Sequence, residues 1–198
     1  KLTLSITANP KHGVPYGGLP HLLLAWMCTE AVRTGSPELS LGRSQAEFLE
    51  KLDLYNDGRY IARVRDQSLR LVRSLISVSG ADGDALGIEN ILIAKRAFLF
   101  WNARDTEQPA LWDSSITLST DFFESLTHAP VPIRMEALQA LKKSPLAMDI
   151  YTWLVYRMFS LNVATIKGGK RLAQVPWAGL MRQFGSGYAN TPKGLANF

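Results

Sequence analysis

The chain has 198 residues, of which 46% are hydrophobic and 20% charged, enough for one large domain or two of about 100 residues each. No apolar run approaches the roughly 20 residues of a membrane-spanning helix, and the N-terminus does not resemble a signal peptide. The single cysteine, Cys28, excludes an internal disulfide, and we interpret it as a buried core thiol of an intracellular protein. The sequence begins with Lys1 rather than methionine, which indicates a piece of a longer chain.

The net charge of +5 is unevenly distributed along the chain. Residues 59–73 carry five basic groups and one acidic group, and residues 160–198 carry five basic groups and no acidic one. The remaining segments, 1–58 and 74–159, each have a small acidic excess. The excess positive charge therefore sits in two segments, which indicates two local anion-binding surfaces.

The first half of the chain is predicted to contain a strand, a helix, a strand, two helices and a β-hairpin. We expect a strand over 2–7, a helix from Pro20 to about Thr34, a strand over 39–41, a helix capped by Ser44 and Glu47, and a helix over 59–73. Strands over 75–79 and 88–101 are predicted to flank a hairpin loop, 80–87. This order is typical of a winged helix, whose wing is the hairpin. The acidity of Asp82 and Asp84 argues against phosphate contact at its tip, and their spacing falls short of a calcium loop.

The second half is predicted to repeat this plan. We expect a connector over 105–113, a strand over 115–119, helices over 121–126 and 134–141, a long helix from Pro145 to about Leu161, and a short helix opened by Pro176. Thr191 and Pro192 have the form of the N-cap and first residue of a last helix. We therefore predict an α+β fold with tandem winged-helix domains, residues 1–108 and 109–198. The second is expected to end within its recognition helix.

The helix predicted over residues 59–73 carries a basic stripe on one narrow face. Its members, within about 40° of the first on a helical wheel, are Arg59, Arg63, Arg70 and Arg73. Only Asp66 interrupts the stripe, whereas a solvated surface helix usually mixes charge signs at i, i+4 spacing. We therefore favour nucleic-acid contact over a solvated charged face. Arg65 falls among the apolar positions of the wheel, and we expect its long side chain to extend outward from them.

Further basic residues follow in the second half. Lys167, Lys170 and Arg171 belong to a tight hairpin or loop, and an ordinary charged surface explains them about as well as DNA contact does. Tyr188, in the turn before Lys193, either contacts phosphate or packs that turn. These five residues are therefore weaker candidates for DNA binding than the arginine stripe.

No pattern typical of an enzyme is present in the sequence. His12, His21 and His128 are scattered at spacings that do not suit a metal site, and the His-x-His pair of a rolling-circle nicking enzyme is absent. The run 168–170 lacks the spacing of a Walker A loop and is followed by arginine rather than Ser or Thr. No Gly-x-Ser-x-Gly elbow occurs. We expect no enzymatic activity, no metal and no cofactor.

Long motifs spread along the chain match a known family. They are Pro-Tyr-Gly-Gly-Leu-Pro-His-Leu-Leu-Leu-Ala-Trp from Pro15, Glu-Leu-Ser-Leu-Gly from Glu38, the arginine helix, Ser-Pro-Leu-Ala-Met-Asp-Ile-Tyr-Thr-Trp from Ser144, and Val-Pro-Trp-Ala-Gly-Leu-Met-Arg-Gln-Phe-Gly-Ser-Gly-Tyr from Val175. In these motifs the chain resembles the RepA-type initiators of bacterial plasmid replication. The resemblance covers nearly the whole chain.

The resemblance implies a bacterial cytoplasmic protein that binds repeated sites in double-stranded plasmid origin DNA, helps to melt the adjacent duplex and recruits host replication proteins such as the initiator and the helicase. It also implies tandem winged helices and a switch between DNA-binding monomers and dimers. The residues that would face DNA are Arg59, Arg63, Arg70 and Arg73 in the first unit and Tyr188 and Lys193 in the second.

Two departures from the family leave an alternative open. The stretch 167–171 lengthens a connection that is short in the family, and the family continues beyond Phe198 with more of the recognition helix and a wing. The alternative is a winged-helix module that acts by dimerisation, autorepression or docking of a host replication protein, without melting the origin itself.

Overall fold

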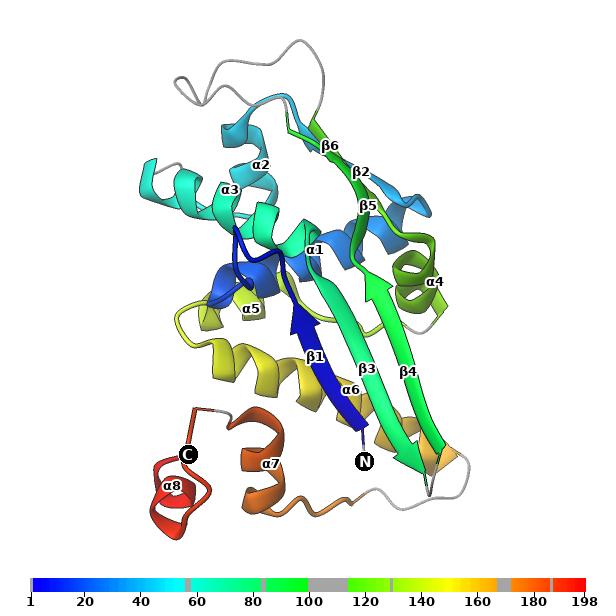
Figure 1. Ribbon diagram of the computed structural model, residues 1–198, viewed down its shortest axis with the longest axis vertical. Helices are drawn as coiled ribbons and strands as arrows, with labels where there is room; N and C mark the ends of the chain where they lie inside the picture. Colours follow the sequence, from blue (N-terminus) through cyan, green and yellow to red (C-terminus); the bar gives the residue numbers. More distant parts are fainter. Residues whose placement is uncertain are drawn as a thin grey trace. The chain divides into compact units, whose positions relative to one another are not determined.

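The computed structural model describes residues 2–55, 58–82, 85–99, 114–128, 130–166, 172–185 and 187–198. The chain divides into two compact units, Lys1–Pro130 and Val131–Phe198, which are described separately (Figure 1). Unit 1 contains β1 (Leu2–Thr7), α1 (Gly18–Thr34), β2 (Glu38–Gly42), α2 (Gln45–Lys51), α3 (Gly58–Val72), β3 (Leu75–Asp82), β4 (Ala85–Leu92), β5 (Ala94–Phe98), β6 (Ser114–Leu118) and α4 (Thr120–His128). Helices and antiparallel sheets occur together, as the predicted α+β class requires.

The strands of unit 1 form two three-stranded antiparallel sheets, ordered β1-β3-β4 and β2-β6-β5. In the first sheet β3 and β4 pair from Leu75 opposite Leu92 to Asp82 opposite Ala85. Most of the loop predicted over 80–87 is therefore strand, because the ladder continues almost to the tip of the hairpin. The three strands run side by side in Figure 1.

The single strand predicted over 88–101 is wrong, because the chain changes sheets at Ile93. β4 ends at Leu92 in the first sheet, and β5 begins at Ala94 in the second. The side chain of Ile93 is buried. Ser119 pairs the backbone carbonyls at this break. Its hydroxyl donates to the Leu92 carbonyl, and its amide donates to the Ile93 carbonyl at 3.2 Å. A buried side chain and paired carbonyls thus stabilise the break.

Helix α1 forms the centre of the core of unit 1. It contacts α3, α4 and β2, and it ends at Gly35, whose φ of 64° is the left-handed conformation that closes many helices. The Trp26 ring meets that of Phe48 on α2 edge to face, with centroids 5.2 Å apart. Cys28, predicted to be a buried core thiol, is half-buried on α1, and this burial raises the pKa of its thiol to about 11.

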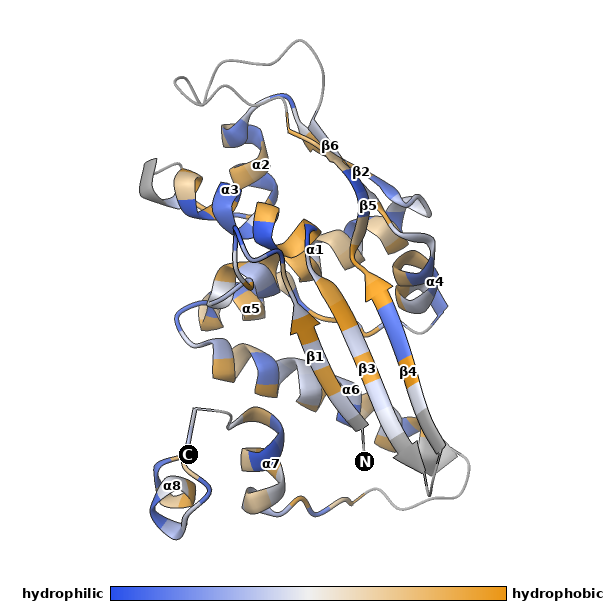
Figure 2. Cartoon of the chain, viewed as in Figure 1, coloured by the Kyte–Doolittle hydropathy of each residue, from blue (hydrophilic) through white to orange (hydrophobic). Residues whose placement is uncertain are grey.

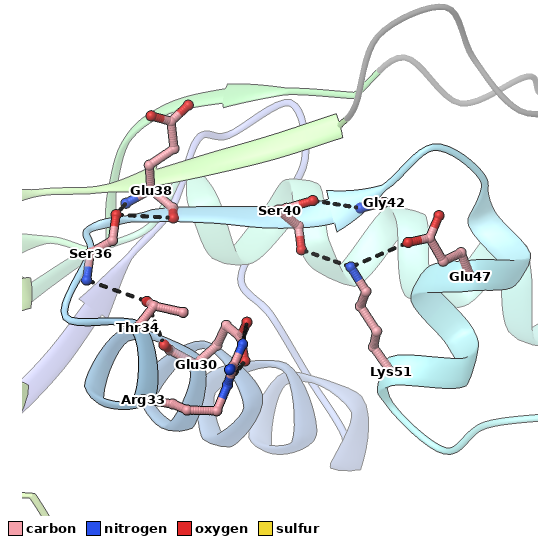
Figure 3. A network of polar contacts seen from close by, with 9 residues as sticks. All are labelled: Glu30, Arg33, Thr34, Ser36, Glu38, Ser40, Gly42, Glu47 and Lys51. Carbon is pink, nitrogen blue, oxygen red and sulfur yellow. Dashed lines mark hydrogen bonds and ion pairs between the residues drawn. The ribbon is translucent and has the colours of Figure 1, made fainter.

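A network of polar contacts fixes α2 against β2 (Figure 3). Ser44 caps α2 by accepting from the Glu47 amide at 3.1 Å, as predicted, while the Glu47 carboxylate accepts from the Arg43 amide at 2.9 Å. Lys51 donates to the Ser40 carbonyl at 3.2 Å and lies 3.5 Å from a Glu47 oxygen. These contacts tie the C-terminal end of α2 to β2 and its N-terminal end to the turn between them.

The first unit is longer than the predicted domain of residues 1–108. Strand β6 pairs with both β2 and β5, and α4 contacts α1 and β4. The sequence predicts both elements to belong to the second domain, because they follow the connector. The pairing of β6 with β2 instead moves the division between the units to Pro130.

Unit 2 consists, over the residues described, of helices and their connections. They are α5 (Met135–Leu141), α6 (Pro145–Ile166), α7 (Trp177–Phe184) and α8 (Pro192–Asn197). Ser144 caps α6 by accepting from the Ala147 amide at 3.2 Å, and Trp153 of α6 meets Phe184 of α7 edge to face. Each helix contacts the next along the chain.

The helices of unit 2 follow the predicted order. Thr191 accepts from the Gly194 amide at 3.0 Å, which confirms the N-cap of α8. Helix α6 continues to Ile166, beyond the end expected near Leu161. Among the helices described, none combines the length and the hydrophobicity needed to cross a membrane.

Candidate nucleic-acid interface

Helix α3 is held against unit 1 by a side that is partly polar. It contacts α1, α2 and β5, and its buried residues are Val64, Gln67, Ser68 and Leu71. A helical wheel predicts a buried side made of apolar residues only, and the burial of Gln67 and Ser68 departs from this expectation. Because Gln67 and Ser68 belong to it, the buried side of α3 is rotated about the helix axis from the predicted position. It is therefore not directly opposite the predicted arginine stripe.

Three arginines of this region are exposed, and we call the solvent side that carries them the arginine face: Arg63 and Arg65, two residues apart, lie at its opposite edges, and Arg73 lies between them. Arg63 and Arg65 lie on α3, and Arg73 directly follows its last residue. None of them forms an ion pair with another residue in the described ranges. The expectation for Arg65 is confirmed, because the rotation of α3 brings it to the solvent side. Figure 2 shows hydrophilic and hydrophobic residues alternating along α3.

Arg70 differs from the arginine face because its guanidinium is already engaged within the chain. Its Nε donates to the Asp66 carboxylate at 2.8 Å, and only 23% of its side chain is exposed. Its Nη1 donates to the Val14 carbonyl at 3.4 Å, and its guanidinium carbon lies 5.2 Å from the centroid of the Tyr16 ring. The structure thus places this predicted contact against the loop that precedes α1.

That loop, residues 9–16, is named the basic loop, and it is fastened to α3 at a second point. The Tyr16 amide donates to Gln67 Oε1 at 2.9 Å, and Gln67 Nε2 donates to Asp66 Oδ2 at 3.0 Å. The same Asp66 oxygen accepts from Arg70. One carboxylate therefore orients both side chains that hold the loop.

The basic loop brings two residues to this site that sequence reasoning missed as DNA contacts, Lys11 and His12. Burial, and then the positive charges of Arg73, Lys11 and Arg70, hold the pKa of His12 below its ordinary value, while Asp66 opposes them. His12 therefore lies in a locally positive field. No sequence signal links the loop to α3, because their contacts join segments far apart in the chain.

The other predicted contacts are placed as follows. Arg59 belongs to α3, but its side chain lies outside the described part, as do Lys167, Lys170 and Arg171 entirely. Tyr188 is exposed, and its ring meets that of Phe198 edge to face with the centroids 5.4 Å apart. Lys193 is exposed in the first turn of α8.

The β3-β4 hairpin, predicted to be the wing, carries acidic residues at or near its tip. Asp84 lies outside the described part, while Glu89 is exposed on β4, so the strand next to the predicted wing tip also carries negative charge. Among the described residues, no three His, Cys, Asp or Glu side chains are placed to hold a metal ion.

The sequence profile of plasmid-encoded RepA proteins matches residues 14–178, which is most of the chain. The chain belongs to this family. The resemblance inferred from the motifs is thereby confirmed, and membership supports a role in the initiation of replication. The matched segment includes the whole of α3 and Arg73. A search of the curated proteins gives no match.

Two crystal structures of domains 2 and 3 of RctB share the fold. A selenomethionine derivative gives a TM-score of 0.54 at 13% identity and covers 92% of this chain and 75% of the RctB chain. The other gives 0.51 at 14% identity, with coverage of 92% and 74%. At such identity the likeness concerns the fold alone. The architecture of this RepA-family chain therefore occurs in experimental structures.

Proposed function

We propose that this chain is a plasmid replication initiator that binds double-stranded DNA at repeated sites of the plasmid origin. The observation that carries the proposal is the arginine face on α3, in a chain that belongs to the plasmid-encoded RepA proteins. Three exposed guanidinium groups without carboxylate partners among the described residues suit the closely spaced phosphates of a duplex. Membership of the family points to a plasmid origin as the DNA that is bound, and the arginine face provides the positive charge that would bind its phosphates.

In this proposal the two units act as tandem winged helices. The order α1, β2, α2, α3, β3, β4 in unit 1 supports it, as does the parallel order α6, α7, α8 in unit 2. Helix α3 would be the recognition helix of the first unit and α8 that of the second, with Lys193 and Tyr188 near the DNA. The hairpin of β3 and β4 would be the first wing, and the charge of Glu89 would keep it from close phosphate contact.

The arginines have different parts in the proposed contact. Arg63 and Arg65, with Arg59 near the start of α3, would supply phosphate contacts and some readout of the major groove. Arg73 would add a phosphate contact at the end of the helix. No step of this function requires catalysis or a cofactor. The protein would act in the bacterial cytoplasm, where host replication proteins join it at the origin.

The proposal is tested by fluorescence anisotropy with duplexes tiled across the origin of the encoding plasmid. The wild-type chain should bind repeat-containing duplexes more tightly than shuffled ones, and Arg63→Ala should weaken this binding at moderate salt. Arg33→Ala is the matched control, because it removes one arginine whose charge Glu30 on the same helix already balances at 2.5 Å. Equal affinity for repeat and shuffled duplexes, or equal effects of the two substitutions, would contradict the proposal.

A second candidate function is self-association through the sheet β1-β3-β4. The pairing places Leu4 and Ile6 on the same face as Val78 and Ile76, and Leu4 and Ile6 are 65% and 45% exposed. Figure 2 shows hydrophobic residues on these strands. Such a face suits a second copy of the chain, in line with the dimer implied by the resemblance. Sizing of the wild type and of Leu4→Thr, with and without origin DNA, separates this function from DNA binding. A monomer at all concentrations would refute it.

A further inference from the structure

Hydrogen bonds within the basic loop define its backbone conformation, apart from its contacts with α3. The Asn9 carbonyl accepts from the amides of His12 and Gly13 at 3.0 and 2.9 Å, and the Asn9 side chain accepts from the Lys11 amide at 2.9 Å. Gly13 has a φ of 74°, which favours glycine. Lys11 and His12 therefore sit at fixed positions in a turn, and the direction of the loop is set by its own hydrogen bonds.

The same turn is pressed against Arg70. A Cβ on Gly13 would lie 2.8 Å from Arg70 Nη1, so the guanidinium packs directly on the loop backbone. Two of its nitrogens are used within the chain, on Asp66 and on the Val14 carbonyl, and its face covers Tyr16. Arg70 is thus suited to hold the loop in place, and less suited than Arg63 to leave the protein for a phosphate.

The basic loop adds positive charge next to the arginine face. Arg70 contacts the loop directly at the Val14 carbonyl, and the charges of Arg73, Lys11 and Arg70 act together with burial to lower the pKa of His12. Lys11 is exposed and forms no ion pair with any residue that the structure describes. Because Arg73 belongs to the arginine face, the charge of the loop continues that surface.

We infer that the basic loop is a second DNA-contacting element, in which Arg70 and Gln67 hold Lys11 and His12 beside Arg73 to bind the phosphate backbone of the duplex. This inference rests on the proposed function of α3. Arg70 is a positioning residue in it. The loop would contact phosphate groups and would not read bases. A short turn that flanks α3 lies next to the DNA strand at the side of the groove, whereas α3 itself enters the groove.

The first test measures how binding of the whole chain to a mixed-sequence duplex depends on salt. Each lost phosphate contact lowers the slope of log affinity against log salt by about 0.9. Lys11→Ala should therefore lower the slope by about 0.9, with a several-fold loss of affinity at moderate salt. Arg33→Ala should leave the slope unchanged. Lys11 is exposed, so its substitution does not endanger folding.

The second test is a double-mutant cycle between Lys11 and Arg70. Arg70→Lys keeps the charge but cannot reach Asp66 and the Val14 carbonyl at once while covering Tyr16. It should lower affinity about as much as Lys11→Ala, and the double variant should lose little more than either single one. Additive losses, or wild-type binding by Arg70→Lys, would overturn the positioning role.

The outcomes distinguish this inference from the function on which it rests. If Arg63→Ala lowers the slope while Lys11→Ala does not, the second element is refuted and DNA binding by α3 stands. If neither substitution changes the slope, both proposals fail. If both lower it and the cycle is non-additive, the loop and the helix form one surface.

Discussion

The guanidinium carbon of Arg70 lies 5.2 Å from the centroid of the Tyr16 ring, and this contact joins α3 to the loop that precedes α1. The pair explains why Arg70 is turned toward the protein while Arg63 and Arg73 of the same stripe remain exposed. It also assigns a structural role to Asp66, the only carboxylate of the stripe, which accepts hydrogen bonds from Arg70 and Gln67 and orients both side chains. Helix α3 therefore holds the basic loop through Arg70 and Gln67, and it exposes the arginine face to solvent.

Gln67 and Ser68 give a matched pair for the stability of α3. Both are 3% exposed, but Gln67 is hydrogen-bonded to Tyr16 and Asp66, whereas the Ser68 hydroxyl has no partner in the described part of the chain. Gln67→Ala should lower the free energy of unfolding by about 1–3 kcal/mol, because it leaves the Tyr16 amide unpaired. Ser68→Ala should leave it unchanged or raise it by up to about 1 kcal/mol.

Urea unfolding, followed by circular dichroism, measures both changes. Equal destabilisation by the two substitutions would show that burial alone matters at these positions. It would contradict the role of Gln67 in fastening the basic loop.

Gly42 is predicted to be required at the junction of β2 and α2. Its φ of 93° disfavours other residues, and a Cβ there would meet the Glu47 carboxylate that accepts from the Arg43 amide. Gly42→Ala should cost about 1–2 kcal/mol for its backbone and about 1 kcal/mol more for the displaced carboxylate. Gly35→Ala is the control, since Gly35 has a φ of 64° and open space around it. If thermal unfolding shows equal losses for both, the contact with Glu47 has no energetic role.

DNA binding is predicted to strengthen as the pH falls, through His12. Burial and the charges of Arg73, Lys11 and Arg70 keep the pKa of His12 low in the free protein, against the opposing charge of Asp66. A nearby phosphate favours the protonated form, so binding takes up part of a proton. Affinity should therefore rise on going from about pH 7.5 to 5.5, by less than about tenfold per unit.

The substitution His12→Gln should remove most of this pH dependence, while His128→Gln, at the end of α4, should preserve it. Anisotropy at constant ionic strength measures the effect. A pH dependence that is the same in wild type and His12→Gln would place the proton elsewhere.

The local signals in the sequence predicted the elements well. Ser44 and Thr191 cap helices as expected, and the helices predicted to end near Thr34 and to begin at Pro145 do so, because capping depends on residues within a turn of each other. The basic character of α3 followed from its composition. Its rotation did not, because Gln67 is buried by partners that only the folded chain provides.

Three of the differences between prediction and structure concern contacts between distant segments. The break at Ile93 depends on Ser119, and the extent of unit 1 depends on the pairing of β6 with β2. The position of Arg70 depends on the loop that carries Tyr16. None of these partners lies near its counterpart in sequence, so periodicity and spacing could not reveal them.

The arginine face is the central claim, and the salt dependence of DNA binding tests it most directly. The measurement compares the wild type with a variant in which Arg63, Arg65 and Arg73 are all replaced by alanine, on one origin duplex over a range of salt concentrations. If all three contact phosphate, the slope of log affinity against log salt should fall by about 2.7. An unchanged slope in a variant that unfolds like the wild type would show that α3 does not face DNA.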